Sequence, residues 1–465
     1  MSGEIPGNGT IPGVESGRGK PAALDSDVVI VGGGLAGLTT AALLARRGLS
    51  PVVLEKSAEP GGRARTGQEA GFLFNLGPRA LYRNGPAWHI LRNLGIPFQG
   101  RQPRTAGEAL CGGRRFVLPT GVRSLLRTRL FNVAEKVQFA QFLERFPKIE
   151  PCSIDGSSVD DWLGTQRLRP RVAEVVRAFL RLSTYCNDFD LASAGAAVAQ
   201  LQMALASGVE YLDGGWQTLV DGLHQALDDA SVRIITQVRA ERVIQTGPAV
   251  AGVRAADGRD YHAPIVVLAC DPPMSVQLVE GRVKSELENW RKNALPVRAA
   301  CLDVGLSRLP RPGATFALGI DRPWYLSVHS ATARLAPPGG AMIHVLRYLS
   351  TQEEPEPKST RHELEGVLDL VQPGWRDVLV RREHLPTMCV ASAVVRADQS
   401  GTANRPGPAV PGIRGLYVVG DWVGREGMLA DASLASAKQA VDAILSARED
   451  APTVKRTPQP SLQGI

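Results

Sequence analysis

Near its start the chain alternates between short apolar runs and a longer segment of helical composition. Asp27–Val31 is a β-branched run typical of a buried strand, and Leu35–Arg47 is rich in Ala and Leu, which favours a helix. Pro51–Glu55 is a second strand-like run. A strand, a helix and a strand within about 30 residues predict a β-α-β unit whose right-handed crossover makes the two strands parallel neighbours.

The same reading assigns elements farther along the chain. Helices are predicted at Ala134–Phe146, Pro170–Leu182, Leu191–Ala206 and Trp216–Asp228. Strands are predicted at Val232–Ile235, Val250–Arg254, Arg259–Ala263 and Ile265–Ala269. A separate antiparallel sheet is predicted from Ala299–Val304, Trp324–His329 and Ala341–Leu346, and the chain continues to a strand at Gly415–Gly420 and a helix at Leu429–Leu445.

The turn between the first strand and the first helix carries a glycine motif. Gly32-Gly33-Gly34-Leu35-Ala36-Gly37 matches G-x-G-x-x-G in the strand-to-helix context that this motif requires. Gly32 permits a tight turn, Gly34 lets the backbone approach a pyrophosphate, and Gly37 allows the helix to pack closely on the strand. Leu35 and Ala36 open the helix, whose free N–H groups attract phosphate charge. The motif predicts a dinucleotide site.

An acidic residue at the end of the second strand narrows the choice of dinucleotide. Glu55 lies 23 residues after Gly32, near the spacing at which a carboxylate binds the adenosine ribose. Its charge disfavours a 2′-phosphate, so FAD or NAD is expected. The alternative is a surface glutamate paired with Lys56, and the combined motif makes that alternative the weaker one.

A second stretch follows directly. Pro60–Arg65 contains Gly62, which frees the backbone to turn, and Arg63, a forked cation able to offset phosphate charge. Gly71–Pro78 then ends in Gly77 and Pro78. This stretch resembles the glycine-arginine signature of the superfamily that contains phytoene desaturases, protoporphyrinogen oxidases, hydroxysqualene dehydroxylase-like enzymes and flavin amine oxidases.

The resemblance implies that the cofactor is FAD and extends to two later segments. Gly415–Trp422 resembles the second FAD segment of the superfamily, in which Gly420 and Asp421 approach the ribityl or pyrophosphate region. In the same segment, Met428 and Leu429 begin a helix that faces the flavin pyrimidine and stabilises negative charge there. The resemblance also places the backbone of Val238 beside the adenine.

Composition and charge exclude some classes of protein. Of 465 residues, 44% are hydrophobic and 21% charged, as in an ordinary soluble globular protein. The net charge is +7, but Lys and Arg form no long block, which argues against a nucleic-acid partner. Attraction to anionic lipid leaves peripheral membrane association open.

The ends of the chain and the cysteines bear on location and metal binding. Residues 1–24 are rich in Gly, Pro and Ser and lack the apolar core of a signal peptide, so they are interpreted as a disordered leader. Residues 448–465 are interpreted as a flexible tail. The six cysteines form no C-x-x-C pair, so we expect reduced thiols, no metal site and a cytoplasmic location.

The predicted fold is α/β: a two-dinucleotide-binding-domain flavoprotein with an inserted α+β substrate domain. The FAD-binding domain is expected to comprise residues 25–110, 212–275 and 410–447, and the substrate domain residues 111–211 and 276–409. Since one G-x-G-x-x-G has the required context, a dedicated NAD(P)H domain is not expected.

The predicted function is FAD-dependent dehydrogenation, or a related oxidation, of an apolar small molecule such as an isoprenoid or natural-product intermediate, by hydride transfer to flavin N5. Arg79 is the candidate residue near the reactive ring; His329 and His344 are interpreted as packing within the predicted sheet. The alternatives are a flavin amine oxidase, a protoporphyrinogen-type oxidase and a non-catalytic flavin-binding scaffold. Flavin amine oxidases, which the chain resembles, place aromatic rings beside the amine. The matching stretch Gly427–Ala430 has no Tyr or Phe, although Trp422 lies a few residues earlier, so a primary amine is not expected. The sequence does not indicate an oligomeric state.

Overall fold

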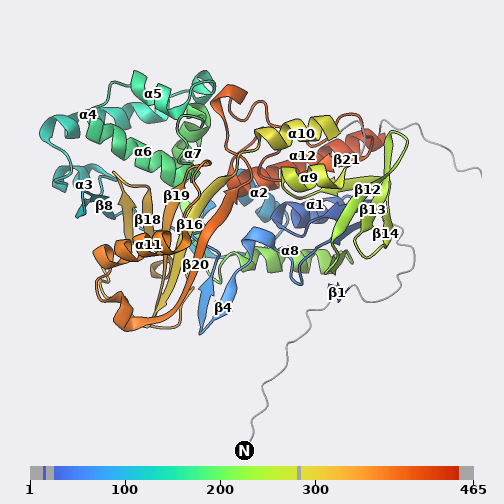
Figure 1. The fold of residues 1–465 in the computed structure, drawn as a ribbon, viewed down its shortest axis with the longest axis horizontal. Coiled ribbons are helices and arrows are strands. Elements are labelled where there is room, and N and C mark those ends of the chain that lie inside the picture. The colour runs from blue at the N-terminus through green and yellow to red at the C-terminus, as the bar shows by residue number, and fades with distance from the viewer. Residues whose placement is uncertain (1–13, 17–25, 280–283, 450–465) are drawn as a thin grey trace, which may run out of the picture.

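A computed structural model describes residues 14–16, 26–279 and 284–449. Two bodies lie side by side along the long axis of the molecule (Figure 1). One body is built around a parallel sheet, and the other around a larger, mostly antiparallel sheet. This architecture confirms the predicted α/β fold with an inserted α+β domain.

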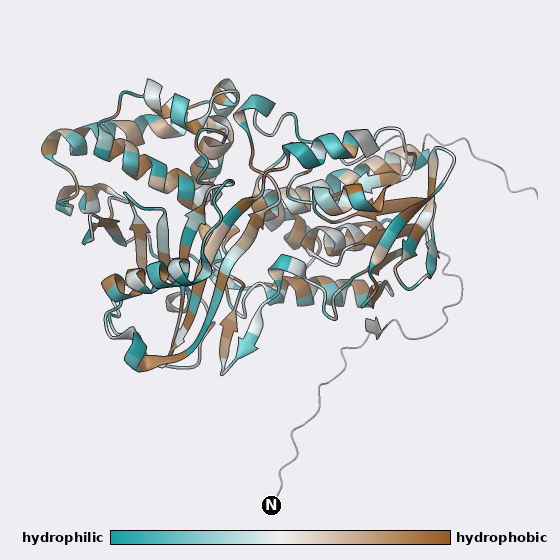
Figure 2. Cartoon of the chain, viewed as in Figure 1, coloured by the Kyte–Doolittle hydropathy of each residue, from teal (hydrophilic) through white to brown (hydrophobic). Residues whose placement is uncertain are grey.

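The first body contains a six-stranded, fully parallel sheet. In spatial order its strands are β1 (Val14–Ser16), β11 (Arg233–Thr236), β3 (Pro51–Leu54), β2 (Val28–Val31), β15 (Ile265–Leu268) and β21 (Leu416–Val418). The residues of β2, β3 and β15 are buried on both faces, which explains their unbroken apolar runs (Figure 2).

Each face of the parallel sheet has its own cover. On one face lie α1 (Leu35–Ala45), α8 (Gln217–Asp229) and α12 (Leu429–Glu449), which pack with the sheet into one apolar core. On the other lies an antiparallel sheet of β12 (Ala240–Thr246), β13 (Ala249–Ala255) and β14 (Asp260–His262). Two further helices, α9 (Pro272–Leu278) and α10 (Lys284–Asn293), also pack on this side.

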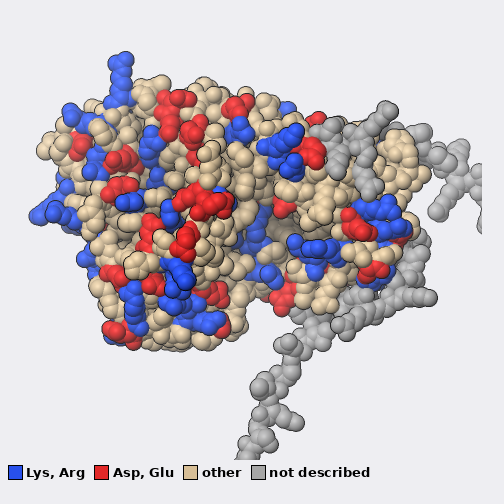
Figure 3. Space-filling model, in the orientation of Figure 1, with Lys and Arg blue, Asp and Glu red and all other residues tan. Residues whose placement is uncertain are grey.

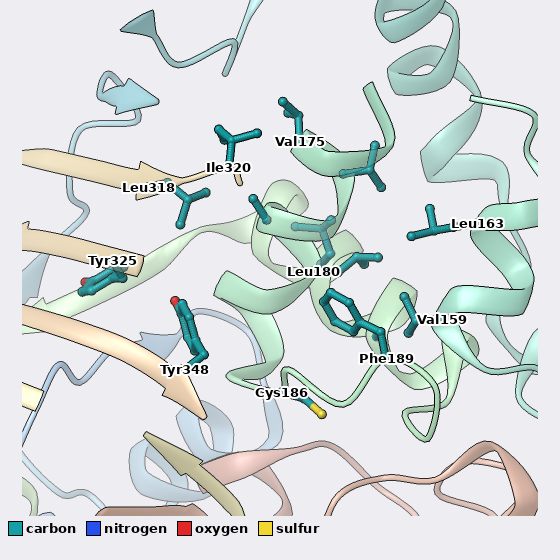
Figure 4. Packing of buried hydrophobic residues seen from close by; sticks show 14 of the residues in the cluster. Val159, Leu163, Val175, Leu180, Cys186, Phe189, Leu318, Ile320, Tyr325 and Tyr348 are labelled. Carbon is teal, nitrogen blue, oxygen red and sulfur yellow. The ribbon is translucent and has the colours of Figure 1, made fainter. Parts of the chain in front are cut away.

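The second body, called the substrate body below after the predicted substrate domain, is a seven-stranded sheet with helices on both faces. In spatial order its strands are β20 (Leu379–Ala391), β16 (Val297–Leu306), β19 (Ala341–Leu349), β18 (Trp324–Val328), β17 (Phe316–Gly319), β8 (Glu108–Cys111) and β9 (Arg114–Val117). One face packs on α4 (Val133–Arg145), α5 (Val159–Thr165), α6 (Pro170–Thr184) and α7 (Ala194–Ser207). Figure 4 shows this core, where Tyr325 and Tyr348 of the sheet face helix residues such as Leu180. The other face packs on α11 (Pro357–Val371).

Shorter elements join the two bodies or extend them. They are α2 (Pro86–Asn93), α3 (Val122–Arg127), the hairpin β4 (Gly67–Glu69) with β5 (Phe72–Phe74), and the small sheet of β6 (Leu81–Tyr82), β10 (Val209–Leu212) and β7 (Gly100–Arg101). Helix α2 packs on α12. None of the helices in the described part of the chain is long and apolar enough to cross a bilayer.

Three boundaries differ from the sequence-based expectations. Residues 14–16, inside the expected leader 1–24, form β1, because the outer edge of β11 offers unpaired backbone groups to an extended segment. Strand β8 pairs with β17 in the substrate sheet, although residues up to 110 were assigned to the FAD-binding domain. Helices α9 and α10 pack with the parallel-sheet body, although residues from 276 were assigned to the substrate domain. Of the expected tail, 450–465 lie outside the described residues.

Candidate functional site

A cavity of about 500 Å³ opens at the carboxyl ends of the parallel strands. Val31, Leu54 and Ala269, at or just after the ends of β2, β3 and β15, lie in its wall, the position at which α/β sheets bind ligands. Most residues predicted for the cofactor site line it: Gly32, Gly34, Leu35, Ala36, Glu55, Lys56, Gly62, Arg63, Pro78, Arg79, Val238, Gly420, Asp421 and Leu429. The described lining of the cavity does not include Gly37, Gly77 or Met428.

The glycine motif shapes the cavity floor as the sequence predicts. Gly32 has φ +111°, and a Cβ there would lie 2.6 Å from the carbonyl oxygen of Ala269. A Cβ at Gly37 would lie 2.0 Å from the carbonyl oxygen of Gly32. The backbone of α1 therefore packs directly against the turn, with no room for a side chain at Gly37. At Gly34 a Cβ would meet open space, with no described atom within 4 Å. Gly34 is the N-cap of α1, so the helix N-terminus is left open for a phosphate.

Glu55 ties together backbone groups in the cavity wall. Its Oε2 accepts the N–H of Gly33 and its Oε1 accepts the N–H of Ser57, both at 2.7 Å. The side chain is buried and lies in the cavity wall, and its bonds run to backbone groups and not to Lys56. A carboxylate has about four acceptor positions, so two remain for ribose hydroxyls. The N–H of Val238 donates to the Glu55 carbonyl, which brings that backbone to the same part of the wall.

The cavity wall also contains an ion pair. Nη1 of Arg63 lies 2.8 Å from Oδ2 of Asp421 and also donates to the carbonyl of Val390. Oδ2 of Asp421 accepts the N–H of Ser392 as well, whereas its Oδ1 has no hydrogen-bond partner among the described residues. Burial would raise the pKa of Asp421, but the charge of Arg63 and these hydrogen bonds hold it below its usual value. An anionic Asp421 with a free acceptor fits a hydroxyl-bearing ligand.

Comparison with known proteins identifies the family. Residues 35–296, more than half of the chain, match the model of flavin containing amine oxidoreductases. The chain belongs to this family. Its cofactor is therefore FAD, and the predicted FAD-dependent oxidoreductase is confirmed at the level of the family.

Curated relatives of this family member include carotenoid desaturases. A hydroxyneurosporene desaturase from Cereibacter sphaeroides is 27% identical over 281 residues, 53% of this chain and 56% of the relative. A zeta-carotene-forming phytoene desaturase from Myxococcus xanthus is 26% identical over 317 residues, 60% of each protein. The chain thus matches little more than half of the length of these relatives.

Solved structures show the same fold. An oxidoreductase from Methanosarcina mazei has a TM-score of 0.71 at 18% identity, covering 90% of this chain and 99% of that one. A putrescine oxidase variant has a TM-score of 0.73 at 15% identity, covering 92% and 100%. At these identities the likeness establishes the shared fold.

In the flavoprotein, the start of α12 faces the cavity through Leu429 and Asp431. Leu429 has φ +55°, a backbone conformation that residues other than Gly rarely adopt. The surrounding structure therefore holds the backbone at the start of α12 in this conformation. Oδ1 of Asp431 accepts the N–H of Ala87 near the start of α2, and its Oδ2 has no partner among the described residues. Burial raises the pKa of Asp431 to about 7. Sequence reasoning missed this residue because its partner lies 344 positions away.

The remaining wall is formed by groups from both bodies. Arg79 lines it, held by weak hydrogen bonds at 3.4 Å to the carbonyls of Asn75 and Leu76. Burial lowers the pKa of Arg79, and the nearby charge of Arg63 acts in the same direction. Beside it lie Tyr185, whose hydroxyl donates to the Pro78 carbonyl, and Met388 of β20.

Aromatic side chains line the cavity, although the sequence led us to expect a rim without them. Tyr82, Tyr185 and Trp216 all line it, although none belongs to the segment Gly427–Ala430 on which that expectation rested. They come from the substrate body and from the β6 and α8 regions, so a single local segment could not reveal them. Trp422, the aromatic residue nearest to that segment in the sequence, also lines the cavity; it is 2% exposed and packs against Trp290.

A buried polar cluster lies behind Gly77. Oδ2 of Asp303 accepts the Gly77 N–H, and its Oδ1 lies 2.7 Å from Nδ1 of His344 and 3.0 Å from Sγ of Cys301. These three side chains are close enough to suggest a metal site that sequence spacing did not reveal, because His344 is the cross-strand neighbour of Asp303. Zinc at about 2.0–2.3 Å from each ligand would set the ligands roughly 3.3–3.8 Å apart, so the observed distances indicate hydrogen bonds.

The two histidines singled out from the sequence lie in this buried region. His344 pairs with Asp303, and Nε2 of His329 lies 3.1 Å from the hydroxyl of Tyr325. Burial lowers the pKa of His329 well below its usual value, so its ring is neutral near pH 7. Neither histidine lines the cavity, in agreement with a packing role.

Proposed function

We propose that this flavoprotein dehydrogenates an apolar small molecule, such as an isoprenoid or another natural-product intermediate. The observation that carries the proposal is the composition of the wall shared by the two bodies. There the apolar side chains of Met388, Leu429 and Ala430 line the cavity with the rings of Tyr82, Tyr185 and Trp216, and Arg79 adds a guanidinium. A hydrocarbon needs no charged partner in such a wall, and it loses little when water is excluded.

Charge argues against a primary amine as substrate. Arg79 lines the cavity without an ion-pair partner among the described residues, and its charge would repel an ammonium group. The carboxylate of Asp421 is already paired with Arg63, and Asp431 tends to be neutral because burial raises its pKa to about 7. An amine that entered beside Arg79 would therefore meet an unpaired positive charge.

The relatives support the same class of substrate. Three that this chain resembles are a hydroxyneurosporene desaturase, a zeta-carotene-forming phytoene desaturase and a 4,4'-diapophytoene desaturase. All three names denote desaturation of an isoprenoid chain. The last is 24% identical to this chain over 72% of its own length.

The chain's own groups bind and orient the cofactor. The N-terminus of α1 at Gly34 would bind the pyrophosphate, Glu55 the ribose, and Oδ1 of Asp421 a hydroxyl of the ribityl chain. The start of α12 would stabilise negative charge on the reduced ring. When bound, FAD accepts a hydride from the substrate. The protein orients the substrate against the cofactor, excludes water from the site and stabilises the charge that forms.

Steady-state turnover tests the proposal. The purified holoprotein is incubated with isoprenoid polyenes in detergent, with primary amines, and with a porphyrinogen, and the products and peroxide are measured. We expect a desaturated or otherwise oxidised product from the apolar substrates. Efficient peroxide release with amines and no product from the polyenes would assign the protein to amine oxidation. No turnover with any substrate would favour the scaffold alternative.

A further inference from the structure

Exposed apolar side chains are concentrated at one corner of the molecule. In the described part of the chain, seven large apolar residues are exposed, and five of them lie between positions 117 and 137. We name these five the α3–α4 corner: Val117, Val122, Leu126, Val133 and Val137. Val122, Leu126 and Val133 are 76%, 70% and 79% exposed. Scattered exposed apolar residues are ordinary, but a cluster of this kind marks a binding surface.

The corner is an ordered part of the fold. Val122 and Leu126 are one turn apart on α3, and Val133 and Val137 are one turn apart on α4, so each pair shares a helix face. Nζ of Lys136 donates to the Leu126 carbonyl at 2.8 Å, which ties the two helices together.

The inner sides of the same helices are already packed. Leu125, Leu130, Phe131 and Phe139 lie buried in the core of the substrate body. The exposed valines and leucine of the corner are therefore not part of that core. Their exposure is a property of the outer surface and not of a poorly packed helix.

Positive charge surrounds the apolar residues. Between positions 114 and 137 the chain carries six basic residues and one acidic residue, Glu135. The basic residues are Arg114, Arg115, Arg123, Arg127, Arg129 and Lys136. Arg115 pairs with Glu108, whereas Arg114, Arg123, Arg127 and Arg129 have no ion-pair partner among the described residues. Figure 3 shows basic side chains projecting from the left edge of the molecule, where Figure 1 places α3.

We propose that the α3–α4 corner docks on an anionic lipid surface. Aliphatic side chains enter the boundary between headgroups and acyl chains, while the surrounding arginines meet lipid phosphates. A protein partner fits less well, because such interfaces are enriched in Tyr, Trp and Phe, and the exposed large apolar residues of the described chain are all Val or Leu. This inference is independent of the reaction proposed above.

Vesicle sedimentation of the full-length holoprotein tests the inference. The vesicles contain phosphatidylcholine alone or phosphatidylcholine mixed with phosphatidylglycerol. We expect binding to the mixed vesicles, weaker binding at high salt, and little binding to the neutral ones. Replacing Arg123, Arg127 and Arg129 by Gln should lower the partition coefficient roughly tenfold or more. Val122→Ser with Leu126→Ser should also weaken binding.

Matched variants separate the corner from general charge and hydrophobicity. Arg47→Gln, Lys358→Gln and Arg414→Gln together remove the same charge from other exposed sites. Leu205→Ser and Val380→Ser remove exposed apolar side chains elsewhere. Both control sets should bind vesicles as the unmodified protein does, and FAD absorbance and circular dichroism verify that every variant is folded.

Three results would overturn the inference. They are no sedimentation with anionic vesicles, equal loss of binding in the control variants, and corner variants that bind normally. If the corner substitutions abolished self-association in gel filtration while vesicle binding was absent, the surface would instead pair two copies of this chain.

Discussion

The two sides of the cavity are built from different kinds of groups. On the parallel-sheet side, backbone groups at Gly32 and Gly34 form part of the surface, together with side chains such as Glu55 that are hydrogen-bonded to the backbone. On the side shared with the substrate body, side chains such as Tyr185 and Met388 form it. Backbone binding tolerates little variation of sequence, whereas a side-chain wall is free to change with the substrate. The difference explains why one family fold serves several substrates.

The largest expected effect tests the backbone side. In Gly37→Ala the new Cβ would lie 2.0 Å from the Gly32 carbonyl oxygen, so α1 must move and the folded protein should be lost or strongly destabilised. Gly34→Ala meets no described atom within 4 Å and has an allowed φ of −78°, so this variant should fold but retain FAD poorly. Soluble yield, circular dichroism and flavin content measure both. Equal behaviour of the two variants would contradict the assigned roles.

Asp431 gives the next largest effect, at the boundary of the two sides. Its pKa is raised to about 7 in the folded protein, so folding favours the protonated form. The stabilising contribution is complete below the pKa of the unfolded chain and is lost as pH rises through about 7. Relative to Asp431→Asn, the native protein should lose on the order of 2–4 kcal/mol of unfolding free energy between pH 4 and pH 8. Urea unfolding at several pH values measures the unfolding free energy of both proteins. If the assignment were wrong, the two free energies would change with pH in the same way.

Glu55 variants test the part of the cavity where we expect the adenosine of FAD to bind. Glu55→Ala removes a charged acceptor that also holds the N–H groups of Gly33 and Ser57, so FAD affinity should fall by about 1.5–3 kcal/mol. Glu55→Gln keeps the shape and one acceptor and should lose less. Fluorescence titration of the apoprotein with FAD compares the two variants. An unchanged dissociation constant in the alanine variant would remove Glu55 from the site.

Variants of Arg63 and Asp421 test whether this ion pair stabilises the folded protein. Arg63→Gln leaves the carboxylate of Asp421 buried without its ion pair and should cost about 2 kcal/mol, less than a fully buried pair because the Arg63 side chain is 43% exposed. Asp421→Asn should cost less, and the double variant should recover part of the loss. Urea unfolding of the apoproteins measures all three. Strictly additive losses would argue against a pair.

Most residues that local sequence motifs predict for the cofactor line one cavity. The glycine turn, Glu55 and Asp421 lie within short segments whose chemistry is set by neighbours in the chain, and these segments converge because parallel strands end at one edge. The side shared with the substrate body depends on pairings that no local pattern encodes. Strand β20 was not predicted, although it carries Met388, and Asp303 meets His344 only through the register of β16 and β19.

The smallest expected effect concerns a cysteine on the side-chain wall. Cys270 and Cys389 both line the cavity, but burial raises the pKa of each thiol, to about 12 for Cys270, so little reactive thiolate forms. FAD should therefore be bound without a covalent link, and Cys389→Ser should leave flavin release on acid precipitation unchanged. Colour that stays with the pellet of the native protein but not of this variant would identify a thioether.

Anaerobic reduction of the bound flavin tests the central claim most directly. The holoprotein is titrated without oxygen with an isoprenoid polyene in detergent, with a primary amine and with NADPH, while flavin absorbance is followed. The account predicts stoichiometric bleaching by the apolar substrate and slow or no bleaching by the other two, because Arg79 repels ammonium groups and one dinucleotide fingerprint serves FAD. Rapid bleaching by the amine or by micromolar NADPH, with none by the polyene, would contradict it.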